Sequence, residues 1–230
     1  MDSTPLVARV VFSIGPVPVT EPVVITWAII ALLAGGAALA TRRLTLVPGT
    51  LQTVLEMVAE VIDDQIRSTM RAEPQPYRAL VGTLFLFILT ANWSSLIPGV
   101  EPPTAHLETD AALGLIVFVA TLYFGIRTLG PAGYAKTFME PTIIMLPVNV
   151  VEVFTRTFSL IVRLFGNVMA GVFIIAIVLS LAGLLVPIPL MALDLLTGSV
   201  QAYIFTALTM VFIASALDEG RPQTGRSITS

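Results

Sequence analysis

The segment NVVEVFTRTFSLIVRLFGN, residues 149–167, constrains the whole chain because it sets charged residues in apolar surroundings. It carries Glu152, Arg156 and Arg163 among valines, leucines and phenylalanines. An unpaired arginine at the centre of a bilayer costs about 2.5 kcal/mol or more. Each of these charges must therefore be paired, face water or take part in the function of the protein.

The composition of the chain is that of an integral membrane protein. Of its 230 residues, 56% are hydrophobic and 12% are charged, whereas soluble domains carry roughly 25% charged residues. The lack of cysteine excludes disulfides, a thiol nucleophile and thiolate-bound metals. A single histidine excludes a multi-histidine metal site, and the net charge of −3 lacks the basic signature of nucleic-acid binding. We therefore expect no metal, no cofactor and no nucleic-acid partner.

Five apolar runs are long enough to cross a bilayer, which takes about 20 residues of helix. They occupy residues 22–40, 78–97, 111–129, 147–182 and 190–217. Residues 50–71 instead alternate apolar and acidic positions at helical spacing, which predicts an amphipathic helix along the membrane surface or the bundle edge. The predicted fold is an all-α integral membrane protein, with five transmembrane helices and one amphipathic membrane-associated helix in a single membrane domain over residues 1–230.

The orientation follows from the basic residues. Nine of the 12 fall in segments on one side of these five crossings: Arg42, Arg43, Arg67, Arg71, Arg78, Arg127, Lys136, Arg221 and Arg226. The positive-inside rule makes that side cytoplasmic. We therefore expect a multi-pass protein of the cell (inner) membrane, with residues 1–21 as an outside arm and residues 218–230 as a cytoplasmic tail.

The last two spans are too long to stand upright in a bilayer. Residues 147–182 make about 54 Å of helix and residues 190–217 about 40 Å, at 1.5 Å per residue. The hydrocarbon core is only about 30 Å thick. We therefore expect both helices to be strongly tilted or bent.

A polar stripe follows one side of the first long helix, at intervals of three or four residues. Its members are Asn149, Glu152, Arg156, Ser159, Arg163 and Asn167. Glu152 and Arg156 stand at i and i+4 and can pair, which favours a structural role for them. Arg163 has no carboxylate one turn away, so its counter-ion must come from elsewhere. A bridge to Asp194 on the next helix would be purely structural, and a carboxylate on another subunit would be functional.

The motif LIVRLFGNVMAG, residues 160–171, resembles the most diagnostic motif of subunit a of F-type rotary ATP synthases. The similarity extends through LPVNVVEVFTRTFSL, ANWSSLIPG, VPIP and QAYIFTALT, and it covers nearly everything from about residue 45 to residue 218. The resemblance implies a non-catalytic stator subunit that translocates protons or sodium ions and couples their flow to ATP synthesis or hydrolysis. It implies as partners a ring of c subunits, b-type peripheral stalk subunits, the whole ATP synthase complex and the lipid bilayer.

The resemblance also implies roles for individual residues. Arg163 matches the essential arginine that faces the rotating ring, so a membrane carboxylate of a c subunit would be its missing counter-ion. Asn167 and Gln201 match polar positions beside that arginine. Asp194 matches an acidic or histidine position on the half-channel through which ions arrive from outside.

The outer and inner ends of the ion path are less closely matched. His106 falls at or near an acidic position at the channel mouth, with Glu108 beside it, and Glu152 and Ser159 are expected along the inner half-channel. Many relatives carry glutamate or histidine directly after the Ala-Gly pair, where this chain has Val172. Ions could therefore arrive by Asp194 alone or with Glu108 and His106, and the ion itself, proton or sodium, stays open.

Other classes of membrane protein fit the sequence less well. A secondary transporter would show internal repeats and broken helices, and solute uptake by the isolated chain would favour it. An intramembrane enzyme would need HExxH, GxSxG or paired intramembrane aspartates, and the sequence has none. The GxxxxGK[ST] nucleotide loop is also missing. A simple membrane anchor would leave the unpaired Arg163 unexplained.

Overall fold

The computed structural model describes residues 10–14, 17–42, 49–97, 100–137, 146–183 and 186–218. Two strands, β1 (Val10–Ile14) and β2 (Val17–Thr20), precede the helices α1 (Glu21–Thr41), α2 (Thr50–Met70), α3 (Gln75–Trp93), α4 (Leu107–Thr137), α5 (Leu146–Ala182) and α6 (Pro187–Asp218). Short 3-10 helices η1 (Ser94–Leu96) and η2 (Pro103–Ala105) lie between α3 and α4. In the described residues, all these long helices except α2 are apolar and long enough to cross a membrane. The chain is thus an all-α, multi-pass membrane protein, as its composition predicts.

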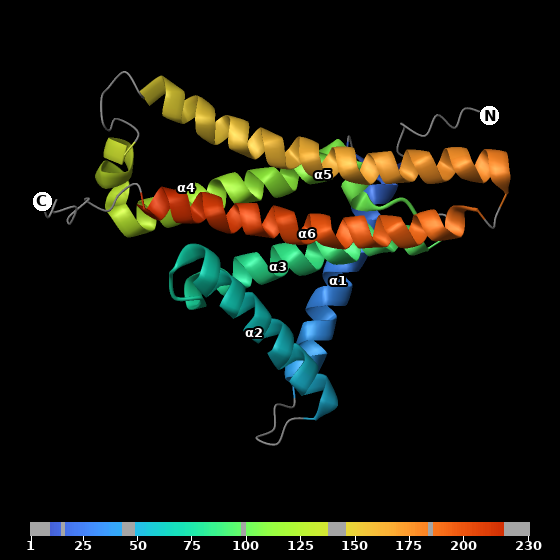
Figure 1. Ribbon diagram of the computed structural model, residues 1–230, viewed down its shortest axis with the longest axis horizontal. Coiled ribbons are helices and arrows are strands. Elements are labelled where there is room, and N and C mark those ends of the chain that lie inside the picture. Colours follow the sequence, from blue (N-terminus) through green and yellow to red (C-terminus); the bar gives the residue numbers. More distant parts are fainter. Residues whose placement is uncertain are drawn as a thin grey trace, which may run out of the picture.

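Helices α3 to α6 lie side by side along the long axis of the molecule, while α1 and α2 run out from them (Figure 1). α1 has 21 residues and hence a length of about 31 Å, which matches an upright crossing of the hydrocarbon core. α5 has 37 residues, about 55 Å, and lies at a steep angle to α1. A bilayer that α1 crosses upright is therefore crossed obliquely by α5 and α6.

The core of the bundle consists of apolar side chains from α3, α4, α5 and α6. Its fully buried members include Ile88, Val117, Leu164 and Phe205. Small residues bring the helices close together, as is usual in membranes. At Gly114, for example, an added Cβ would lie 2.4 Å from Ile161 Cγ1, so α4 and α5 touch where α4 has no side chain.

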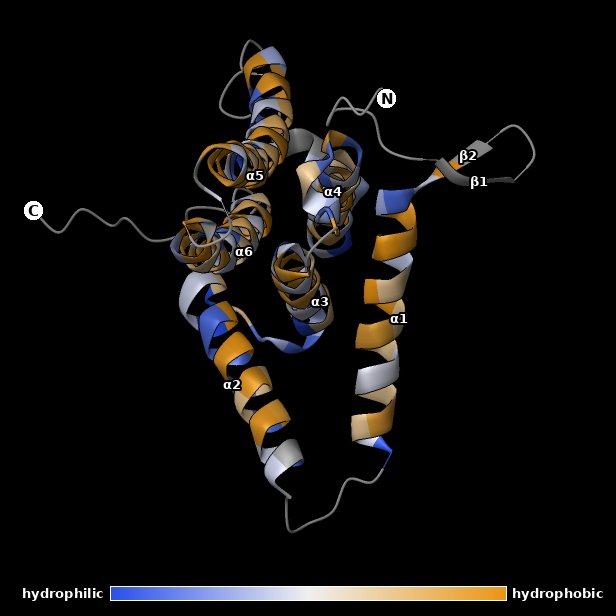
Figure 2. Ribbon diagram, turned by 90° about the vertical axis from the view of Figure 1, so that its right-hand side faces the viewer, coloured by the Kyte–Doolittle hydropathy of each residue, from blue (hydrophilic) through white to orange (hydrophobic). Residues whose placement is uncertain are grey.

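Helix α2 packs by one end only. Ile66 and Met70 near its C-terminus are buried against α3, α4 and α6, and the carboxylate of Asp63 accepts hydrogen bonds from Arg78 of α3. Its N-terminal half stands away from the bundle with apolar residues such as Val54 and Met57 exposed. Figure 2 shows α1 hydrophobic along nearly its whole length, whereas α2 mixes hydrophobic and hydrophilic residues. The structure thus confirms an amphipathic helix at the edge of the bundle.

The structure differs from the sequence-based expectation in two places. The arm before the first span contains the antiparallel pair β1–β2, where no regular structure was expected; valine-rich runs on both sides of a Gly-Pro dipeptide are the signal for it. Helix α4 also extends beyond the predicted span 111–129 at both ends, because it runs from Leu107 to Thr137 with a kink at Gly130. This places Asp110 inside a helix, where it is buried, and not in a solvated loop. The expected tail lies outside the described residues, apart from Asp218.

Candidate functional site

Arg163 projects from an outward face of α5. Its side chain is exposed, whereas Leu160 and Leu164 on the other side of the helix are buried in the core. Within the described part of the chain, the ion pairs are Arg67–Asp64, Arg78–Asp63, His106–Glu101 and Arg156–Glu152, and Arg163 belongs to none of them. The arginine is therefore available to a partner outside this chain.

A groove of about 630 Å³ follows α5 and α6 past Arg163. Its lining residues are Val148, Val151, Glu152, Thr155, Arg156, Ser159, Leu160, Arg163, Leu208 and Phe212. The structure thus brings together four residues of the polar stripe that the sequence singled out: Glu152, Arg156, Ser159 and Arg163. They form a polar line along one wall of a groove whose other residues are mostly apolar.

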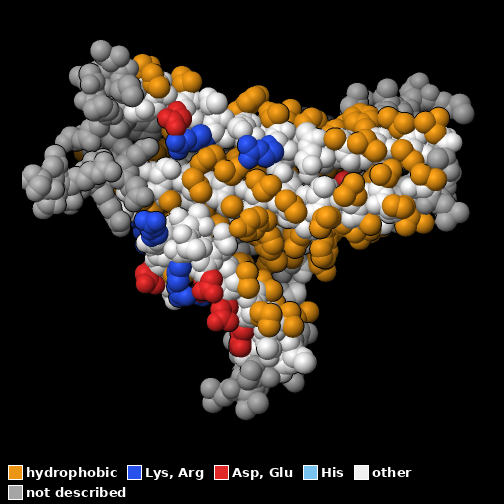
Figure 3. All heavy atoms as spheres, viewed as in Figure 1, with side chains coloured by type: hydrophobic (Ala, Val, Ile, Leu, Met, Phe, Trp, Pro, Cys, Tyr) orange, Lys and Arg blue, Asp and Glu red, His pale blue; other side chains and the backbone are white. Residues whose placement is uncertain are grey.

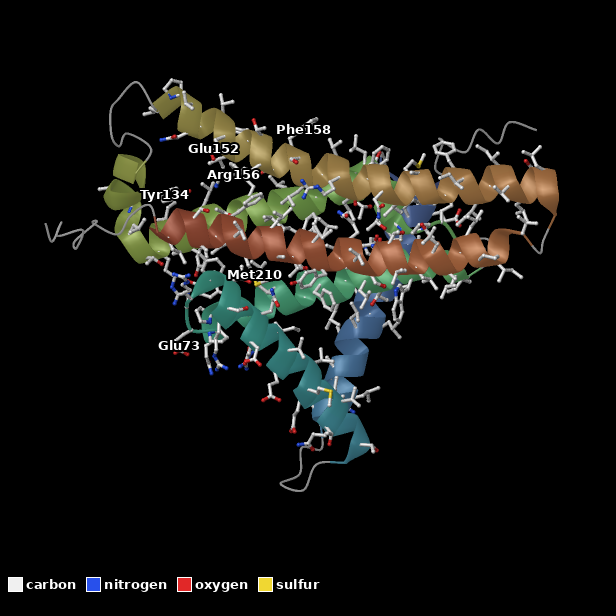
Figure 4. All side chains as sticks on the ribbon, viewed as in Figure 1. Glu73, Tyr134, Glu152, Arg156, Phe158 and Met210 are labelled. Carbon is white, nitrogen blue, oxygen red and sulfur yellow. The ribbon has the colours of Figure 1, made fainter. Side chains whose placement is uncertain are left out.

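The ion pair between Glu152 and Arg156 is present, as their spacing predicts. The guanidinium of Arg156 also lies 5.6 Å from the ring centre of Phe212 on α6, a distance at which cation–π attraction operates. Figure 4 shows both side chains toward the start of α5, near Tyr134 at the end of α4. Glu152, Arg156 and Tyr134 also line a second, smaller cavity of about 40 Å³ there. Arg156 is therefore held inside the chain, unlike Arg163.

Asp194 lies against the backbone of α5. A Cβ added at Gly171 would stand 2.0 Å from Asp194 Oδ1, so only glycine leaves room for this carboxylate. Ser95 Oγ donates a hydrogen bond to Asp194 Oδ2 across 3.4 Å. Gly171 is two turns beyond Arg163, about 12 Å along α5. The structural alternative, an Arg163–Asp194 bridge, is therefore wrong for the part of the chain that the structure describes.

The two predicted amides lie at different depths from the surface of the bundle. Asn167, one turn beyond Arg163 on α5, is half-buried. Gln201 on α6 is only 6% exposed, and its Nε2 has no hydrogen-bond partner among the described residues. Gly198 lies one turn before Gln201 on α6, and its carbonyl oxygen accepts a 2.8 Å hydrogen bond from the side-chain amide of Asn92 on α3. This bond fixes the distance between α3 and α6.

His106 and Glu108 line a separate cavity of about 550 Å³ between the start of α4 and the C-terminal half of α5. Glu101 lies there too, with its Oε2 3.5 Å from His106 Nε2. Val172 forms part of the wall, and Asp194 does not. The residues predicted for ion arrival therefore form two groups, one at Asp194 and one around this cavity.

Sequence reasoning missed the hydroxyl that accompanies Asp194. Ser95 stands in the quoted motif ANWSSLIPG, but a serine carries no signal of its own until the packing of α3 on α6 is known. Gly171 likewise carries no such signal in the sequence, and the structure shows that it makes room for a carboxylate. Among the described residues, no cluster of three or more histidine, aspartate or glutamate side chains could hold a metal ion.

Comparisons with known proteins agree with the motif. The family model described as ATP synthase A chain matches residues 23–214. The chain is 52% identical to "ATP synthase subunit a 2" of a Bradyrhizobium species, over 94% of this chain and 97% of that protein. It is 47% identical to "ATP synthase subunit a 1" of Prosthecochloris aestuarii, over 90% and 94%, and 45% identical to "ATP synthase subunit a" of Albidiferax ferrireducens, over 91% of each. These matches span most of the chain and confirm the resemblance of its central motif: the chain belongs to the ATP synthase A chain family.

Proposed function

We propose that this chain is the ion-translocating stator subunit in the membrane sector of an F-type ATP synthase, with no catalytic nucleotide site of its own. The observation that carries the proposal is Arg163, exposed on an apolar face of α5 and unpaired within the described chain. Arginine stays cationic at any accessible pH, and an unpaired cation in the membrane is costly. The partner that completes this site is a carboxylate on another subunit.

A ring of c subunits fits the face around Arg163. The exposed side chains that flank it on α5 are mostly apolar and include Val148, Val151 and Val162. A mostly apolar surface with one unpaired cation suits a wall of transmembrane helices, each of which carries one carboxylate. The b-type peripheral stalk subunits would hold this subunit still while the ring turns.

Ions would reach the ring from the outer end and leave at the inner end. The outer half-channel would run past Asp194, Asn167 and Gln201, with the cavity of His106 and Glu108 at its mouth. There an ion neutralises a ring carboxylate, which can then face lipid. After nearly a full turn the carboxylate reaches the groove of Glu152 and Ser159 and releases its ion to the inner side.

Arg163 would have two tasks in this cycle. Its charge stabilises the ionised form of the ring carboxylate and so favours release of the ion. As a fixed cation it also repels an ion that would pass directly from one half-channel to the other. One charge that crosses 100 mV carries about 2.3 kcal/mol, so a leak would dissipate the energy that several ions must supply for each ATP.

We place this protein in the cell (inner) membrane. Its N-terminus would lie outside and its C-terminus in the cytoplasm. In support, charged side chains on the face in Figure 3 gather toward one end, while the opposite end is mostly hydrophobic. Arg67, Arg71 and Arg78 lie at the junction of α2 and α3, and basic residues favour the cytoplasmic side. Arg43, Arg221 and Arg226 lie outside the described residues.

The test is R163A in the complete ATP synthase, with ATP-driven ion uptake measured in inverted membrane vesicles. We expect uptake to be lost while the complex remains assembled, because the variant removes the charge and keeps the helix. R67A is the matched control, since Arg67 is an exposed arginine on α2. Full coupling in R163A would refute the proposed function.

A further inference from the structure

A carboxyl group inside the bundle has no part in the pathway above. Asp110, in the first turn of α4, is 0% exposed, and neither of its carboxylate oxygens has a hydrogen-bond partner among the described residues. Buried polar groups in native proteins are almost always hydrogen-bonded, so each exception calls for a physical reason. An unpaired carboxylate is costly as a buried anion. It must therefore carry a proton or hold a cation.

The orphaned polar atoms of the bundle belong to a small set of residues. In the part of the chain that the structure describes, they are both oxygens of Asp110 and Gln201 Nε2, and His106 Nε2 makes no hydrogen bond although it lies 3.5 Å from Glu101 Oε2. His106 lies one turn before Asp110 and lines the outer cavity of about 550 Å³. The set therefore begins at a hollow on the outer side and continues into the core.

The packing of the helices fixes the depth of Asp110. Gly114, one turn further along α4, touches Ile161 of α5, and the two helices run in opposite directions (Figure 1). One turn back along α4 thus corresponds to one turn forward along α5, which is residue 164 or 165. In agreement, Ala111 and Phe165 line the same cavity. Asp110 therefore lies at the level of Arg163, but inside the bundle.

The same argument brings Gln201 to this level. Asp194 of α6 touches Gly171 of α5, and these two helices are also antiparallel. Two turns inward from this contact are Gln201 on α6 and Leu164 on α5. Arg163 is adjacent to Leu164 in sequence but points outward, since Arg163 is exposed and Leu164 is buried. The carboxyl group of Asp110 and the amide of Gln201 thus occupy one layer of the core, behind the arginine.

We infer that Asp110 is a cation-binding residue of the outer half-channel, which takes up a proton or a monovalent metal ion arriving from the cavity at His106 and passes it on at the level of Gln201. The inference rests on the proposed function, because it adds a relay residue to that pathway. Asp110 also supplies a buried acid on the outer side of a chain that has Val172 on α5, at the position where many relatives carry glutamate or histidine. A carboxyl group that alternately binds and releases a cation must not be tied to a permanent hydrogen-bond or ion-pair partner. Asp110 meets this condition among the described residues.

The test uses the complete ATP synthase in inverted membrane vesicles, with ATP-driven proton uptake followed by fluorescence quenching and sodium uptake by radioactive sodium. D110N keeps the shape of the side chain and removes its ability to carry a cation. We expect uptake per assembled complex to fall about tenfold or more, the scale on which a lost proton-transfer group acts. D110E, which keeps a carboxyl group, should retain more transport than D110N. The unmodified complex shows in the same two assays whether the cation is a proton or sodium.

D64N is the matched control, because Asp64 is an exposed carboxylate on α2; its uptake should stay within about two-fold of the parent, as for most surface substitutions. Uptake within that range in D110N would overturn the inference. Failure of D110N to assemble would also overturn it, since a relay site must accept a neutral side chain of the same shape. R163A is assayed in parallel: if R163A abolishes uptake and D110N does not, only the relay is refuted, whereas full coupling in R163A refutes the proposed function itself.

Discussion

Replacement of Gly171 by alanine should displace the carboxylate of Asp194, and so disturb the proposed outer half-channel, without replacing a charged residue. The new Cβ would lie 2.0 Å from Asp194 Oδ1, whereas such contacts normally exceed roughly 3.4 Å, so the carboxylate must move by about 1.4 Å. Because it is the end of a side chain that moves, we expect a loss of stability near the lower end of the ~1–3 kcal/mol typical of overpacking. The move also breaks the 3.4 Å hydrogen bond from Ser95 and shifts the group that we propose receives ions from outside.

The assay combines ATP-driven ion uptake with the thermal stability of the purified complex. G171A should lower both, whereas G35A on α1, where an added Cβ meets nothing within 4 Å, should lower neither. The double variant G171A/D194A should recover stability, because the clash is gone, but should not recover uptake. Parental uptake and stability in G171A, or no recovery of stability in the double variant, would refute this account of the contact.

Three further predictions follow from the described contacts. D194N should slow uptake from the outer side in an assembled complex, because it removes the carboxylate beside Gly171, and unchanged rates would exclude Asp194 from the pathway. N92L should lower the melting temperature of the complex, since Asn92 makes two buried hydrogen bonds, and each partner left unsatisfied costs about 1–3 kcal/mol. D63N should loosen the C-terminal half of α2 and raise its rate of proteolysis modestly, because Arg78 is partly exposed and water already screens its attraction to Asp63; the same rate as the parent would mean that apolar contacts alone hold α2.

The sequence predicts the helices well because its signals there are local. The apolar runs, the charge pattern of the amphipathic helix and the i, i+4 pair Glu152–Arg156 all depend on neighbours within a few turns. The length of α5 can also be read directly from the sequence, and it was enough to predict that this helix crosses the membrane obliquely.

The contacts that shape the site depend on packing between helices, and the sequence could not supply them. Asp110 stands in a stretch of polar and acidic residues, so only its register inside α4 shows that it is buried. The fit of Asp194 against Gly171 requires α5 and α6 to be aligned to within one residue. The separation of His106 from Asp194 into two groups likewise depends on how the helices pack, which no local pattern encodes.

The central claim, that the face of Arg163 meets the membrane carboxylate of a rotating ring, can be tested by a single cross-link. The chain has no cysteine, so S159C introduces a unique thiol in the groove one turn from Arg163. With a second cysteine placed beside the carboxylate of the c subunit, oxidation should join the two subunits and stop ATP-driven ion uptake, and reduction should restore it. L115C, at an exposed position on α4, should form no such link. Absence of the link in S159C, or its formation without loss of uptake, would contradict the account.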